Sequence, residues 1–201
     1  MDRGVRASLC CAVVMFSFLA LMSQSKTVTI SEPEVIGLAD LFRQADIVAS
    51  VKIVSGDAEN YDIAIYKATV LQSFKGPKDG TAIYLGPYVG LRLGGEYIVF
   101  LHNGSEVIAP KSAGAAYGPI RYAKIFNEGY SAMLSSYECV FNGSGPAQQC
   151  GEAVRIYTDY IKSPKGIATF PPGPEDTAFG CRWVRKTEFV SALISLMKAP
   201  K

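Results

Sequence analysis

The stretch that decides the fold runs from Ala45 to Leu101 and reads ADIVASVKIV (45–54), YDIAIYKATVLQSFKGPKDGTAIYL (61–85) and LGGEYIVFL (93–101). Short segments rich in β-branched and aromatic residues, bounded by glycine and proline, are typical of strands. The Gly- and Pro-containing segment Lys75–Gly80 marks a turn between two of them. The stretch therefore predicts consecutive strands.

The first two of these strands carry the information about shape. In the first, the alternate residues Ile47, Ala49, Val51 and Ile53 form an entirely apolar face, while the opposite face is mixed. The second strand begins near Tyr61, extends to Phe74 and changes its apolar face on the way. A two-residue period changes face only at a bulge or sharp coil, which we place near Tyr66-Lys67. Long strands that coil in this way are typical of a small closed barrel.

The segment Glu96–Leu101 is apolar on both faces, so we expect it to be covered on both sides. Two helices could provide the cover. Ser31-Glu32-Pro33-Glu34 reads as a capping box that starts a helix reaching Ala45. Near the other end, Thr187 is a plausible N-cap with Glu188 in the first turn, and an apolar stripe follows. Its members are Phe189, Val190, Leu193, Ile194 and Met197.

Beyond residue 103 the periodicity weakens, and we expect an irregular extension of the same domain. Thr81–Leu85 is the third strand, and shorter strands are expected further on. They are 123–127, 137–141, 154–161 and 182–184. The segment 163–180 is rich in Pro and Gly and reads as a loop.

The first 25 residues read as an export signal. Arg3 and Arg6 precede an apolar run from Leu9 to Met22, and small residues before Lys26 predict cleavage after Ser25. A membrane span needs about 20 residues, more than this run supplies. We therefore expect a secreted or periplasmic chain, 26–201, that forms one domain without a stable membrane span.

Three cysteines remain after the signal is removed: Cys139, Cys150 and Cys181. In an oxidising compartment two of the three are expected to pair. The loop Asn142–Pro146 lies between Cys139 and Cys150 and can bring their segments together, so we prefer that disulfide. Cys181 would then be a buried thiol or would link to another chain, and the pairs that include Cys181 stay open.

The sequence offers little chemistry. The net charge of +2 falls to +1 in the mature chain, without the basic excess that a nucleic-acid partner requires. His102, the one histidine, has no accompanying nucleophile motif and reads as a strand-end side chain. The cysteines and His102 lack zinc-ligand spacing, and Gly90–Gly95 leads into a strand rather than a phosphate-binding helix. We therefore expect no catalytic, cofactor-binding or metal-binding residue.

Three features of the opening stretch resemble the netrin-like or tissue-inhibitor-of-metalloproteinases-like domain. They are Ala45-Asp46 at the start of the first strand, Lys75-Gly76 after the long strand, and Gly95-Glu96-Tyr97 at the buried strand. The resemblance covers Leu38 to Leu101. It implies an OB-fold-like closed five-stranded barrel with a flanking N-terminal helix and a C-terminal helix.

The same resemblance implies little about mechanism. Animal inhibitors of this family chelate the protease zinc through a cysteine at the mature N-terminus. Here no cysteine lies between Cys11 and Cys139, so that mechanism is not carried to any residue.

We therefore expect a non-enzymatic binding module with a protein partner, and a protease inhibitor-like role as a narrower possibility. The expected surface is the barrel rim, formed by loops 55–60, 86–94 and 112–119. Two alternatives stay open: an envelope structural or assembly protein, in which Cys181 joins chains, and an enzyme with a dispersed site.

Overall fold

The computed structural model describes residues 35–141, 148–163, 165–171 and 180–199. The expected signal peptide 1–25, the capping box 31–34 and the loop 142–146 lie outside them. In chain order the elements are β1 (Ile36–Gly37), α2 (Leu38–Gln44), β2 (Ile47–Asp57), β3 (Ile65–Lys75), β4 (Ala82–Gly86), β5 (Glu96–His102), β6 (Val107–Ile108), β7 (Ile120–Arg121), β8 (Ala123–Ile125), the 3-10 helix η1 (Asn127–Gly129), β9 (Ala132–Phe141), β10 (Gln148–Tyr157), β11 (Ile161–Lys162), β12 (Thr169–Phe170), β13 (Cys181–Arg185) and α3 (Lys186–Lys198).

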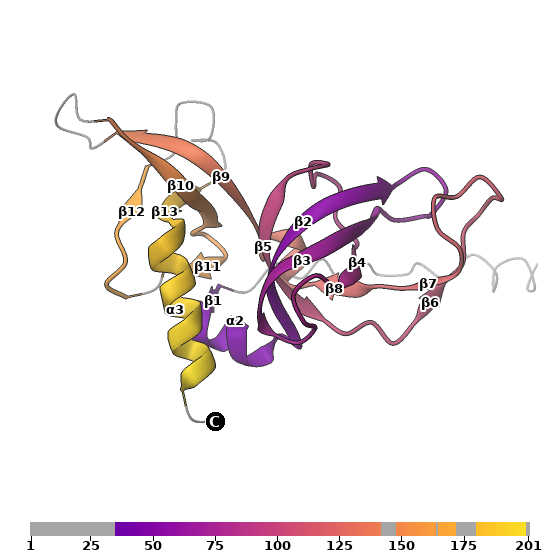
Figure 1. Ribbon diagram of the computed structural model, residues 1–201, viewed down its shortest axis with the longest axis horizontal. Coiled ribbons are helices and arrows are strands. Elements are labelled where there is room, and N and C mark those ends of the chain that lie inside the picture. Colours follow the sequence, from indigo (N-terminus) through magenta and orange to yellow (C-terminus); the bar gives the residue numbers. More distant parts are fainter. Residues whose placement is uncertain (1–34, 142–147, 164, 172–179, 200–201) are drawn as a thin grey trace, which may run out of the picture. The chain divides into compact units, whose positions relative to one another are not determined.

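Five strands close into a barrel in the order β5-β2-β3-β4-β8 and back to β5. All neighbouring pairs are antiparallel except β4 and β8, which run parallel. Counted along the chain, the third and fifth barrel strands are β4 and β8, and they are neighbours, as in the five-stranded Greek-key barrel of the OB-fold. The predicted OB-fold-like closed barrel, with a helix before it and a helix at the C-terminal end, is confirmed (Figure 1).

The barrel interior is filled by alternate residues of its strands, as the sequence pattern of β2 predicts. Ile47, Ala49, Val51 and Ile53 all point into this first core, together with Tyr66, Ala68 and Val70 of β3. Val48 points the other way into a second core.

The change of apolar face along β3 has a different cause from the one expected. Ile65 packs outside the barrel in a third cluster, and Tyr66 and Ala68 pack inside it, so the strand alternates without interruption there. The register irregularity at this level lies in β2, where Val54 is additional between the pairs Ile53↔Ala68 and Ser55↔Lys67. The face of β3 changes further along the strand: Val70 lines the barrel core, Phe74 lines the second core, and the register with β2 shifts at Leu71 and at Phe74.

β5 belongs to two cores, as its doubly apolar sequence predicts. Tyr97, Val99 and Leu101 point into the barrel, whereas Ile98 and Phe100 point into the second core. One edge of β5 pairs with β2, and the other is divided between β9 along Glu96–Val99 and β8 at its end.

The second core lies on a sheet that extends from the barrel. Strands β9, β10, β13 and β12 continue beyond β5 in that order. Helices α2 and α3 contribute Leu38, Leu41, Phe189 and Leu193 to this core. Figure 1 shows α3 lying along this sheet and α2 beneath it. The region expected to be irregular thus supplies the fifth barrel strand and most of a second layer.

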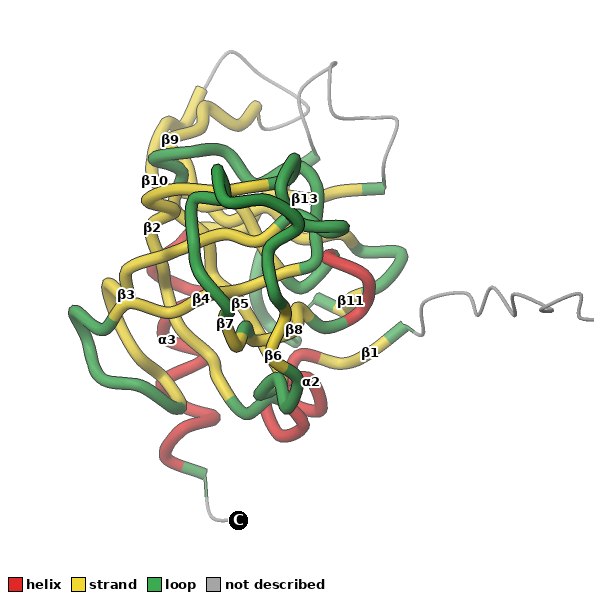
Figure 2. Tube along the Cα trace, turned by 90° about the vertical axis from the view of Figure 1, so that its right-hand side faces the viewer, coloured by secondary structure: helices red, strands yellow, loops and turns green. Residues whose placement is uncertain are grey.

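Both helices begin at positions that differ from the expectation. Ile36 and Gly37 pair with Ile161 and Lys162 as a short parallel ladder, so α2 starts only at Leu38. Figure 2 shows β1 beside β11, with α2 following directly. α3 begins at Lys186 with Arg185 as its N-cap, so the predicted N-cap Thr187 is already helical. Glu188 does lie in the first turn.

Two of the residues on which the family resemblance rests, Lys75 and Asp46, form hydrogen bonds that hold neighbouring segments in place. The ammonium group of Lys75 donates hydrogen bonds to the carbonyl groups of Phe42, Arg43 and Ala45 and so holds the end of α2. The carboxylate of Asp46 accepts a hydrogen bond from the Asn103 N–H at 2.9 Å. These contacts explain the pattern through packing and turns.

Candidate functional site

Two of the three predicted rim loops meet around Asp57, a carboxylate that is 8% exposed. Its Oδ1 accepts hydrogen bonds from the backbone N–H groups of Glu59 and Asn60, at 3.1 and 3.0 Å. Its Oδ2 accepts one from the N–H of Ala116 in the other loop, at 2.9 Å. The bond to Ala116 crosses between loops 55–60 and 112–119, so one side chain holds both in place.

The same bonds favour the ionised form of Asp57. The N–H of Ala116, followed by that of Asn60, lowers the pKa of the Asp57 carboxyl below its ordinary value. The ionised carboxylate and the assembled loops therefore stabilise each other, and protonation of Asp57 would weaken the connection between the loops.

Tyrosines complete this connection. The Tyr61 hydroxyl donates to the carbonyl oxygens of Tyr117 and Gly118, which lie 2.5 and 2.8 Å away. Burial raises the pKa of Tyr61, which keeps the hydroxyl protonated as a donor. The Tyr117 hydroxyl lies 2.8 Å from Ser55 Oγ, and the Tyr84 ring meets the Tyr117 ring edge-on at 5.2 Å. The end of the barrel is thus a fixed surface.

The third predicted loop, 86–94, closes the mouth of the barrel. Leu91 is 6% exposed and packs into the barrel core. The backbone N–H groups on either side of it, of Gly90 and Arg92, donate to the hydroxyls of Tyr66 and Tyr97 at 3.3 and 2.9 Å. Both tyrosine rings lie inside the barrel, so the loop is attached to the core at three successive residues.

This attachment leaves two branched side chains facing water. Val89 is 81% exposed and Leu93 is 66% exposed, on either side of the buried Leu91. Val54, 55% exposed, follows Ile53, whose backbone hydrogen bonds to Gly94 and Gly95 bring this part of β2 close to Leu93. We call Val54, Val89 and Leu93 the rim patch. Ser55, which contacts Tyr117, follows Val54, so the rim patch adjoins the two connected loops.

Tyr88 attaches the same loop to the extended sheet. Its ring lies against Gly129, where an added Cβ would come within 2.0 Å of a ring carbon. Burial raises the pKa of Tyr88, and Tyr157 and Tyr130 lie close enough to contribute to the rise. Tyr130 in turn stacks on Tyr160 with ring centroids 3.7 Å apart. The loop is therefore fixed at its start as well as at its centre.

His102 lies exposed at the end of β5. Its ring lies against that of Phe126, with centroids 3.4 Å apart and the ring planes tilted by 33°, and its Nδ1 is 3.7 Å from Asp46 Oδ2. No serine, threonine or cysteine side chain of the described residues hydrogen-bonds to it. The arrangement matches a strand-end side chain, as expected.

The two cysteines of the predicted disulfide occupy opposite positions in the β9-β10 hairpin, where Cys139 is the register partner of Cys150. Directly opposed residues of antiparallel strands have Cα atoms about 4.5–5.5 Å apart, which suits a disulfide. The Cys139 side chain lies outside the described residues, so the bridge stays a prediction. Cys181 is a thiol in β13 and is 3% exposed.

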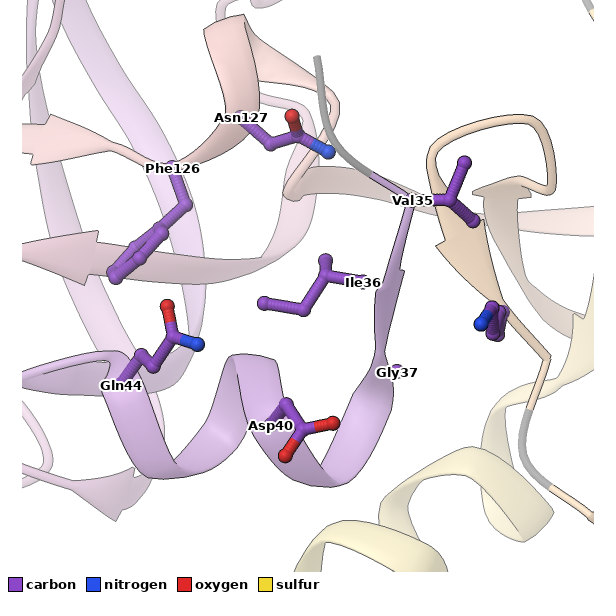
Figure 3. Close-up of a pocket in the computed structure, with 8 residues that line it drawn as sticks. Val35, Ile36, Gly37, Asp40, Gln44, Phe126 and Asn127 are labelled. Atoms are coloured by element: carbon purple, nitrogen blue, oxygen red, sulfur yellow. The ribbon is translucent and has the colours of Figure 1, made fainter.

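A polar pocket of about 420 Å³ lies between α2, β1 and η1. Figure 3 shows Asp40 and Gln44 on α2 at one side, Asn127 at the other and Ile36 between them. Asn127 has a φ of 49°, in the left-handed region that asparagine tolerates. Asp40 forms an ion pair with Arg43 at 2.7 Å, and Lys162 also lines the pocket.

Sequence reasoning missed this pocket because its residues come from three distant segments. The β1-β11 ladder brings Lys162 beside Gly37, and a two-residue ladder leaves no periodic signal. The turn sequence Asn127-Glu128-Gly129 was the one visible cue.

The described residues contain no group of three or more His, Cys, Asp or Glu side chains placed to hold a metal ion. Among the helices that the structure describes, none has the length and apolarity to cross a membrane.

Comparisons with known proteins leave the family open. No protein-family model matches the chain, and no curated protein or solved structure matches it significantly.

Proposed function

We propose that this chain is an exported, non-enzymatic binding protein and that a protein partner docks on the rim patch. The observation that carries the proposal is the alternation Val89 out, Leu91 in, Leu93 out, on a loop whose intervening N–H groups are bonded to barrel tyrosines. Two large apolar side chains are thereby held in water in a fixed geometry.

Such a geometry favours association. A loop that is already ordered loses little conformational entropy when a partner binds, so more of the contact energy appears as affinity. Apolar side chains that are grouped and exposed mark interaction surfaces more often than scattered ones. The connected loops, one of which follows Val54 in the chain, carry exposed polar side chains such as those of Glu59 and Ser112, of the kind that form the polar rim of an interface.

Export and the narrower inhibitor-like role rest on the sequence. The apolar leader with its basic start supports a secreted or periplasmic location. Inhibition of an extracellular protease is supported by the family resemblance alone. Among the alternatives, an assembly role through Cys181 is disfavoured because a thiol that is 3% exposed cannot reach a second chain without local opening.

The test places a photoactivatable benzoylphenylalanine at Val89 of the exported chain in its own source cells. Met197, 49% exposed on α3, is the matched control position. We expect one discrete protein adduct from position 89 and none from position 197. Excess wild-type protein should suppress this adduct, while excess Leu93→Asp should not.

Three results would refute the docking surface. They are the absence of an adduct at position 89, the same adduct at position 197, and suppression by Leu93→Asp equal to that by the wild type. If the adduct is a protease, an activity assay with purified protein tests the inhibitor-like role separately.

A further inference from the structure

We infer that a groove between α2 and α3 binds the alkyl chain of a long-chain carboxylate, a fatty acid. The groove has a volume of about 480 Å³ and shares Gly37 and Lys162 with the polar pocket. Pockets for small ligands measure about 300–1,000 Å³. The inference is independent of the proposed function because none of the groove residues belongs to the rim patch.

The floor of the groove is apolar and belongs to the second core. Leu38 is 5% exposed, and Ala192 and Leu196 of α3 are packed partly against the same core. Ala39 forms part of the wall. An alkyl chain lying here would exchange water for a surface continuous with the hydrophobic interior, which favours binding in proportion to the apolar area covered.

The polar groups at the groove select a negative charge. Lys162 and Lys165 both line it, and no acidic side chain is among its described lining residues. Neither lysine forms an ion pair with a residue that the structure describes. Ser195 donates its hydroxyl hydrogen to the Ser191 carbonyl at 2.9 Å, so the ammonium groups are the charged donors available to a carboxylate.

Together these features specify an amphiphile with one anionic end. A cationic amphiphile would meet two like charges, and a short carboxylate would leave the floor wet. The chain-length dependence is therefore diagnostic, since each methylene buried should tighten binding about four-fold until the groove is full.

The experiment is calorimetric titration of the mature chain with octanoate, decanoate and dodecanoate below their micelle concentrations. We expect one site per chain, the four-fold gain per methylene, and weaker binding at high salt because the lysines are exposed. Acetate and dodecyltrimethylammonium should not bind. Equal binding of the cationic amphiphile, or several equivalents per chain, would overturn the inference.

Two lysine variants locate the site. Lys165→Glu should weaken dodecanoate binding about ten-fold, and Lys198→Glu, the same change on an exposed α3 residue outside the groove, less than two-fold. Equal effects of the two would refute the assignment. Because both residues are exposed, neither change should prevent folding.

Amide chemical shifts provide a second measurement that does not depend on affinity. Dodecanoate should move the signals of Ala39, Ser163 and Leu196 and leave those of Val89 and Leu93 in place. Shifts confined to the rim patch, a dimer that covers the groove without ligand, or binding to anionic vesicles in place of the free carboxylate would each contradict the proposed occupant.

Discussion

Replacing Leu91 by alanine should show that loop 86–94 contributes to stability through its buried residue and not through its exposed ones. Leu91 fills the mouth of the barrel, and its neighbour two residues on, Leu93, points into water. The two leucines lie in one loop and differ in burial, 6% against 66% exposed. Leu93→Ala is thus a matched control for Leu91→Ala.

The expected magnitude follows from the atoms removed. Leucine to alanine deletes three carbon groups, worth about 0.8 kcal/mol each when buried, or about 2.4 kcal/mol together. An unfilled cavity adds to this, and the loop can relax only partly because Tyr66 and Tyr97 hold its N–H groups. We expect Leu91→Ala to lower the free energy of unfolding by about 3 kcal/mol, and Leu93→Ala by less than about 0.5 kcal/mol.

Urea unfolding measures both values, with the fluorescence of Trp183, the one tryptophan and 3% exposed, as the signal. The denaturant slope should be the same in both variants. A loss below about 1 kcal/mol for Leu91→Ala, or equal losses for the two leucines, would refute the view that Leu91 plugs the barrel.

Three further outcomes are expected. Gly129→Ala should destabilise the fold by about 1–3 kcal/mol in thermal unfolding, because its φ of 101° disfavours a side chain and the new Cβ would strike the Tyr88 ring; an unchanged melting temperature would contradict that contact. Asp57 has a lowered pKa in the folded state, so its stabilising effect is full above the ordinary carboxyl pKa of about 3.9 and is lost as the pH falls through the lower folded value. Asp57→Asn should remove that part of the loss of stability in acid. Identical profiles of stability against pH for the variant and the wild type would argue against this role. Thiol titration of the unfolded, unreduced mature chain should find one thiol, and reduction of the Cys139–Cys150 bridge should cost about 3 kcal/mol; three thiols would show that the bridge is absent.

The barrel could be predicted from the sequence because the alternation of apolar and polar residues along its strands shows which faces are buried. β2 has one apolar face and lines one core with it, and β5 has two apolar faces and lines two cores. The turn at Lys75-Gly76 was visible because Gly76 needs a φ of 103°. Local chemistry and tertiary structure agree in these segments.

The second layer could not be predicted because its information is not local. β9 pairs with half of one edge of β5, and β11 contributes two residues that hold β1. The α2 start illustrates the limit: Ile36 lies within the predicted helix but pairs with Ile161 in a short ladder. Tertiary pairing overrides propensity in such short segments.

The sequence predicted which loops form the rim of the barrel but not the contacts that hold them. Loops 55–60 and 112–119 were expected at the same surface, and the carboxylate that joins them, Asp57, had no distinguishing motif. The alternation of Val89, Leu91 and Leu93 is visible in the sequence. Its meaning depends on the hydroxyls of Tyr66 and Tyr97, which reach the loop from other strands.

The sharing of β5 between two cores has a consequence for how the chain can be divided. A fragment that ends after His102 would lack the strand that closes the barrel and would expose Ile98 and Phe100 to water. The amide hydrogens of β5 should accordingly exchange with solvent only when the barrel and the extended sheet unfold together. The barrel of this protein is thus no transplantable module, and any attempt to shorten or recombine the chain has to carry the extended sheet with it.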